Sequence, residues 1–160
     1  MKFRATILTL SLALFACSGG GDPKEAAYEA LQSGDYAAAV DGFGALVAKA
    51  SPGSPEHLEL AVEHCRALAH TSPETAQTTF IALADELGEK ITPKDYSMVV
   101  TELAGEKAFM PAIALLEKAG EKYADNETMK SLFEKVKARV EAGEDPEAVK
   151  ALSSLPYAGG

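Results

Sequence analysis

The fold is decided by residues 34–47, GDYAAAVDGFGALV, which place one small and two large apolar residues at helical spacing. These are Ala39, Phe43 and Leu46, at positions i, i+4 and i+7. In a helix their side chains lie on one face, one per turn, and the small residue lets a partner helix approach closely. The segment therefore predicts a helix that packs tightly against a neighbour.

The same series recurs at intervals of 36 or 37 residues through the rest of the chain. The three further copies are Ala76, Phe80, Leu83; Ala112, Leu116, Ala119; and Ala148, Leu152, Leu155. A fixed period of this length is typical of helical repeat proteins, in which stacked helix pairs bury a shared core. The chain is therefore expected to form four stacked helical hairpins.

Helix starts are marked by a capping residue, usually followed by proline at the first helical position, as in Asp22-Pro23, Ser54-Pro55 and Thr92-Pro93. The sequence has no sustained alternation of apolar and polar residues, so it predicts no β-strand. The predicted fold class is all-α. We expect helices at about 23–33, 36–50, 55–70, 73–88, 93–106, 110–123, 127–142 and 146–153. The apolar end, residues 152–157, is expected to fold back over the last hairpin.

Two stretches resemble the tetratricopeptide repeat family. Residues 34–40, GDYAAAV, are similar to the family's turn between paired helices, with Ala39 at its alanine position. Tyr96, Val99, Val100 and Leu103 stand where the family has tryptophan, leucine, glycine and tyrosine, so Val100 departs from the pattern. The likeness covers about residues 23–155, and it implies a solenoid of about four antiparallel helical hairpins.

The resemblance also implies a contact surface, because the family binds partners along the first helix of each pair. Carried over by position, that surface includes Tyr28, Leu31, Gln32, Ser97, Thr101 and Ala104. An alternative for Leu31 is simple packing on the next helix. The leading hypothesis is a non-catalytic adaptor that binds an envelope protein or peptide and is monomeric without it. A structural or accessory subunit of an envelope complex is the alternative, ahead of a metal-binding protein or an enzyme.

The N-terminus predicts a bacterial lipoprotein. Residues 1–16 combine two basic residues, an apolar stretch and a final small residue, which is the pattern of a cleaved secretory signal. Leu14-Phe15-Ala16-Cys17 resembles the lipobox, which implies that Cys17 carries a diacylglycerol and an N-acyl chain. Residues 17–22 would form a flexible tether, and residues 23–160 one domain. Ser18 after the cysteine favours the outer membrane, with the protein facing the periplasm and touching the membrane only through its lipid.

Charge makes nucleic acid an unsuitable partner. The chain carries a net charge of −9, and loss of Lys2 and Arg4 with the leader makes this −11; phosphate binding needs clustered cations instead. The excess of acidic over basic residues is greatest before Pro93. A basic partner would therefore bind to that part of the chain. In the helix predicted at 127–142, Lys130 and Lys137 share one side, and Lys135 and Arg139 another. A solvated helix surface would explain both pairs; the alternative is contact with anionic lipid headgroups or an acidic partner.

No catalytic residue is predicted, because no P-loop, serine-nucleophile or metalloprotease motif occurs. His57 and His64 are seven residues apart on one predicted helix, next to Cys65, and could in principle ligate a soft metal. Cys65, however, lies at the centre of an apolar arc, which favours a core role. We therefore predict no metal and no cofactor beyond the lipid on Cys17. Once Cys17 is acylated, Cys65 is the only remaining thiol, so no intramolecular disulfide is expected.

Overall fold

The computed structural model describes residues 21–159, and this part of the chain is helical without strands, which confirms the predicted all-α class. The predicted signal peptide, residues 1–16, and the predicted lipidated Cys17 lie outside the described residues. The elements are α1 (Pro23–Ser33), α2 (Tyr36–Val47), α3 (Pro55–Thr71), α4 (Pro73–Leu87), η1 (Gly88–Lys90), α5 (Pro93–Gly105), α6 (Phe109–Tyr123), α7 (Glu127–Ala142), α8 (Pro146–Leu152) and η2 (Pro156–Gly159). The 3₁₀ turn η1 was not predicted.

Most helices begin where the capping residues predict. Asp145 accepts hydrogen bonds from two backbone N–H groups of α8, and Asn126 does the same for α7. The Asp95 carboxylate accepts from the backbone N–H of Thr92, which closes a capping box at α5. Ser72 differs, because its hydroxyl lies 2.7 Å from the Thr75 hydroxyl and caps no backbone group.

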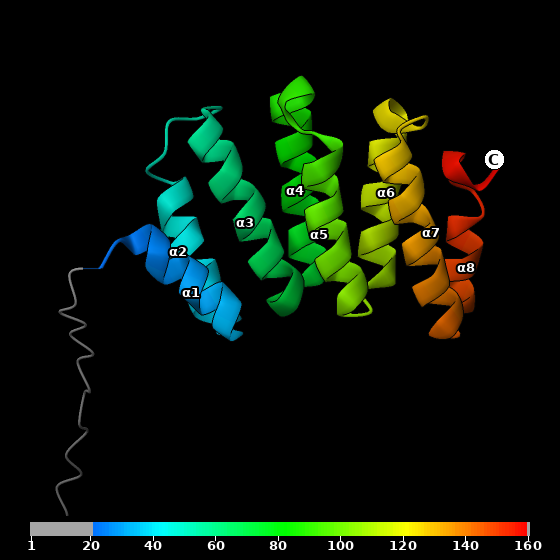
Figure 1. Ribbon diagram of the computed structural model, residues 1–160, viewed down its shortest axis with the longest axis horizontal. Coiled ribbons are helices and arrows are strands. Elements are labelled where there is room, and N and C mark those ends of the chain that lie inside the picture. Colours follow the sequence, from blue (N-terminus) through cyan, green and yellow to red (C-terminus); the bar gives the residue numbers. More distant parts are fainter. Residues whose placement is uncertain (1–20, 160) are drawn as a thin grey trace, which may run out of the picture.

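The helices form two rows (Figure 1). In the first row, α3 packs on α5 and α5 on α7; in the second, α4 packs on α6 and α6 on α8. Helix α1 continues the first row, since Lys24 and Tyr28 both bond to Glu59 of α3. Helix α2 packs on both α1 and α3. Each helix thus contacts mainly helices near it in the sequence.

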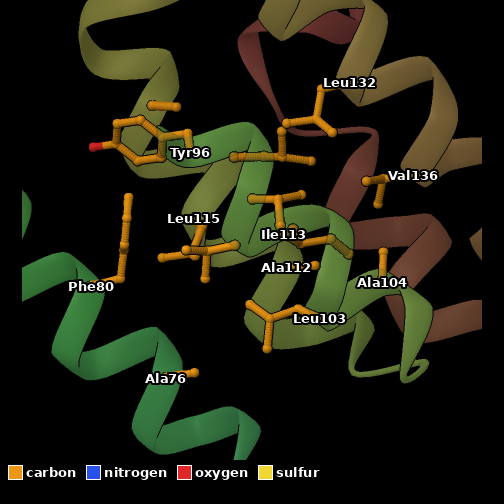
Figure 2. Packing of buried hydrophobic residues seen from close by; sticks show 14 of the residues in the cluster. Ala76, Phe80, Tyr96, Leu103, Ala104, Ala112, Ile113, Leu115, Leu132 and Val136 are labelled. Carbon is orange, nitrogen blue, oxygen red and sulfur yellow. The ribbon is translucent and has the colours of Figure 1, made fainter. Parts of the chain in front are cut away.

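The core lies between the two rows and is built on the repeated apolar series. Every member of the four series is buried except Leu46, which is half-buried. The alanines at its first position, Ala39, Ala76, Ala112 and Ala148, are all 0% exposed. Phe80 of α4 meets the ring of Tyr96 of α5 edge-on at 5.0 Å between centroids, with Leu115 of α6 beside them (Figure 2). A second, smaller cluster around Phe43 holds α1 and α2 to α3.

Two glycines permit close contacts that a side chain would block. A Cβ on Gly42 of α2 would lie 2.9 Å from the Cβ of Ala27, so α1 and α2 meet at their backbones. A Cβ on Gly120 of α6 would lie 2.6 Å from Cγ of Pro156. The chain end packs there, with Leu155 and Tyr157 buried, which confirms the predicted fold-back. The Tyr157 hydroxyl is buried without a hydrogen-bond partner in the described part of the chain.

We predict that Phe80→Ala lowers the free energy of unfolding by about 3–5 kcal/mol, because it empties a fully buried aromatic site. The matched control is Met110→Ala on α6, whose side chain is 44% exposed and should change stability by less than about 1 kcal/mol. Urea denaturation followed by circular dichroism measures both. Equal losses for the two variants would contradict the core described above.

Candidate functional site

The exposed side of the first row is hollowed between α5 and α7. Two open cavities of about 550 and 360 Å³ meet there, and both are lined by Ser97, Thr101 and Thr128. We call this depression the α5–α7 trough. Its remaining lining residues are Arg66, Lys94, Met98, Glu102, Glu127, Ser131, Leu132 and Lys135.

Small polar side chains create the trough. Ser97 and Thr101 are one turn apart on α5, and Thr128 and Ser131 are one turn apart on α7, so four hydroxyls line its walls. Leu132 is buried beneath them. Hydroxyls can both donate and accept hydrogen bonds, which suits the alternating N–H and C=O groups of an extended peptide. The trough therefore combines an apolar floor with adaptable polar walls.

The cations of the trough are less neutralised than its carboxylates. Lys94 and Lys135 are exposed, and neither makes an ion pair within residues 21–159. Glu102 already binds Arg66 at 2.6 Å, and Glu127 binds Lys130 at 3.2 Å. The local charge left for a ligand is therefore positive, although the chain as a whole is acidic.

One wall of the trough is fixed by a charged network between α3 and α5. Arg66 donates from Nη1 to Glu63 at 2.8 Å and from Nη2 to Glu102 at 2.6 Å. Glu63 is only 6% exposed, and this burial raises the pKa of its carboxyl, against the opposing effect of Arg66. A carboxylate this buried needs its cation, so Arg66 has little freedom to turn toward a ligand.

The network continues through His70 at the end of α3. Its Nδ1 lies 2.8 Å from Glu106 and its Nε2 lies 3.3 Å from Glu102. The imidazole is stacked on the ring of Tyr36, with centroids 3.7 Å apart and planes 1° from parallel. This contact connects α2 to the charged network, which therefore joins the three helices α2, α3 and α5.

The six residues of the predicted contact surface fall into three groups. Ser97 and Thr101 lie together in the trough. None of the three residues on α1 lines it: Tyr28 donates to Glu59 at 2.9 Å, Leu31 packs half-buried on the smaller cluster, and Gln32 is exposed. The alternative of simple packing for Leu31 fits this position.

Ala104 requires a correction. It was expected to face a partner, but it is 3% exposed and belongs to the core (Figure 2). The position carried over from the family resemblance is buried in the large hydrophobic cluster, to which α5, α6 and α7 all contribute. Its side chain offers no surface to a ligand.

Sequence reasoning missed Lys94, Thr128 and Ser131 as lining residues. A usable signal exists on α7, where Thr128, Ser131 and Lys135 follow at i, i+3 and i+7 and therefore lie on one side of the helix. Lys135 and Arg139 were predicted to share one side of α7, and both lie on the side that faces α5. Arg139 donates to the backbone oxygen of Thr101 on α5 at 3.4 Å, and Lys135 lines the trough.

The histidines lie elsewhere. His57 and His64 line one cavity of about 450 Å³ between α2, α3 and α4. His57 accepts a hydrogen bond from the backbone of Gly53, and burial lowers the pKa of His64. Cys65 is fully buried, which raises the pKa of its thiol to about 12. Within residues 21–159, no three histidine, cysteine or carboxylate side chains converge on one metal position.

We predict that Arg66→Met lowers the free energy of unfolding by about 2 kcal/mol at pH 7, because it leaves the Glu63 carboxylate buried without a cation. Adding Glu63→Gln should recover at least half of this loss. Lys122→Met removes an ion pair with the almost fully exposed Glu89 and a contact with the Tyr123 ring, and should change stability by less than about 1 kcal/mol. Urea titrations of the four proteins test this, and a double variant no more stable than Arg66→Met would contradict it.

Comparison with protein-family models, with curated proteins and with solved structures finds no match for this chain. In the described part, no helix combines the length and apolar character needed to cross a membrane. What the protein does must therefore be inferred from its own pattern and geometry.

Proposed function

We propose that this protein is a lipid-anchored envelope adaptor that binds an extended segment of another envelope protein in the α5–α7 trough, without catalysis. The observation that carries the proposal is the junction of two open cavities at Ser97, Thr101 and Thr128, where hydroxyl groups and two unpaired lysines surround an apolar floor. Elongated open depressions of this kind suit a chain segment better than a small compact ligand.

The chemistry of the trough favours an acidic segment. The hydroxyls can bond the peptide backbone whatever its sequence, whereas Lys94 and Lys135 select for carboxylates near the two ends of the bound stretch. Glu127 opposes this attraction only weakly, since it is bonded to Lys130. Glu102, in contrast, shares Arg66 with Glu63 and keeps part of its negative charge. A basic segment would instead meet the more acidic region before Pro93.

We further propose that residues 23–155 form a tetratricopeptide-like solenoid. The buried alanine series in α2, α4, α6 and α8 supports this, as does the packing of the helices in two rows. In such a fold the trough lies on the surface formed by the first helix of each pair, where the resemblance locates partner binding. Tyr28 and Leu31 then act mainly in holding α1 to the rest.

The anchor is proposed from the sequence of the first 22 residues. Cys17 carries the acyl chains, residues 17–22 serve as the tether, and the protein faces the periplasm from the outer membrane. Several acyl chains hold a protein on a bilayer far more firmly than one. A partner bound in the trough would consequently be kept close to that membrane.

We predict that a photo-crosslinking residue at Thr101 of the full-length protein, in its own cells, captures one specific envelope protein. Lys94→Glu with Lys135→Glu should reduce that product about tenfold or more, because two attractive charges become repulsive. Lys49→Glu with Lys107→Glu makes the same net change at exposed sites away from the trough and should leave the product unchanged. Equal losses in both doubles, or the same product from a crosslinker at Glu117 on α6, would refute trough binding.

The anchor gives a separate prediction. Mass spectrometry of the mature protein should find an N-terminal peptide that begins at Cys17 and bears acyl chains. Cys17→Ser should move the protein out of the membrane fraction, whereas Cys65→Ser, at a buried thiol, should leave it there. A mature protein that begins at another residue, or Cys17→Ser protein that stays with the membrane, would count against the lipoprotein assignment.

A further inference from the structure

The last helix pair exposes an apolar surface at the C-terminal end of the rows. Val149 of α8 is 43% exposed, one of two large hydrophobic residues so exposed in the described chain. It borders a cavity of about 240 Å³ between α7 and α8, whose other lining residues are Phe133, Lys137, Glu141, Leu152 and Ser153. We call this the end surface; it lies on α7 and α8, the last α-helices of the two rows (Figure 1).

The internal repeat offers a comparison for Val149. This residue directly follows the series alanine Ala148, as Ile113 follows Ala112 in the preceding pair. Ile113 is only 4% exposed and belongs to the core. The apolar residue after the series alanine is therefore buried in the third pair and exposed in the fourth.

The charged residues beside the end surface form a pattern that is complementary to the same pattern on a second copy of the chain. Helix α7 exposes Lys130, Glu134, Lys137 and Glu141 at i, i+4, i+7 and i+11, which lie on one side of the helix. Lys137 and Glu141 line the cavity, so this charged side borders the end surface. If a second α7 crosses antiparallel, Lys130 meets Glu141 of the copy, and Glu134 meets Lys137. Both pairings share one midpoint, between residues 135 and 136.

A parallel copy in register would instead oppose lysine to lysine and glutamate to glutamate. The only ion pair that one of these four residues makes in the described chain joins Lys130 to Glu127, which is 88% exposed on its side chain. An ion pair this exposed contributes little to stability, so Lys130 can leave Glu127 and pair with another carboxylate. A patch that complements itself under a two-fold rotation is the requirement for an isologous dimer.

We infer that a second copy of this chain binds the end surface, with α7 antiparallel to α7 of the copy and Val149 at the apolar part of the interface. This inference goes beyond the proposed adaptor function and replaces the monomer expected from the sequence. Thr128, Ser131 and Lys135 lie toward α5, away from the charged side of α7, so both troughs stay open. The two α1 helices then lie at opposite ends of the dimer.

The test is a charge exchange in the full-length protein purified in detergent, with mass measured by sedimentation equilibrium. The wild type should be a dimer. Lys130→Glu with Lys137→Glu makes the α7 row entirely acidic, and Glu134→Lys with Glu141→Lys makes it entirely basic. Each variant should be monomeric, with a dimer dissociation constant raised about tenfold or more. An equal mixture of the two, carrying different tags, should form a mixed dimer.

The mixture distinguishes disruption of the interface from unfolding, because two unfolded variants would not form a dimer with each other. A monomeric wild type, a dimer in either variant alone, or a mixture that stays monomeric would overturn the inference. The apolar contribution has a matched pair of variants. Val149→Glu should abolish the dimer, whereas Met110→Glu, at a residue of nearly equal exposure on α6, should preserve it.

Discussion

The structure depends on how closely its helices can approach one another. One fully buried alanine per repeat, in α2, α4, α6 and α8, removes the bulk that would hold neighbouring helices apart. At Gly42 the approach is closer still, since α1 reaches the backbone of α2. The only cysteine in residues 21–159 is a free, buried thiol, so no disulfide within this range holds the helices in place.

Electrostatics adds a fixed geometry to that packing. Arg66 joins a buried carboxylate of α3 to a carboxylate of α5, and His70 extends the contact toward α2 through the ring of Tyr36. Breaking such a network is costly, because it leaves a carboxylate buried without its cation. The Arg66 side of the trough wall is therefore held in place. Lys94 and Lys135, which make no ion pair within residues 21–159, remain available to a ligand.

Helix positions could be predicted from the sequence because their signals are local. Caps such as Asp145 and Asn126 act on backbone groups two or three residues away, so they hold whatever the tertiary context. The site could be predicted only in part. Ser97 and Thr101 were carried over by position from the family resemblance, but Ala104, carried over in the same way, is buried. Thr128 and Lys94 line the trough only because α7 and α5 pack side by side, which no pattern within one helix reveals.

The division of the core into two clusters has a consequence for dynamics. The smaller cluster, around Phe43, holds α1 and α2 to α3, while the larger one extends from α3 to the chain end. When neighbours supply most of the contacts, opening one end need not disrupt the other. We therefore expect local opening to begin at α1, which packs mainly on α2, whereas α2 is joined to both clusters. Hydrogen exchange should then be fastest in the helix nearest the N-terminus and slower in the helices that line the trough.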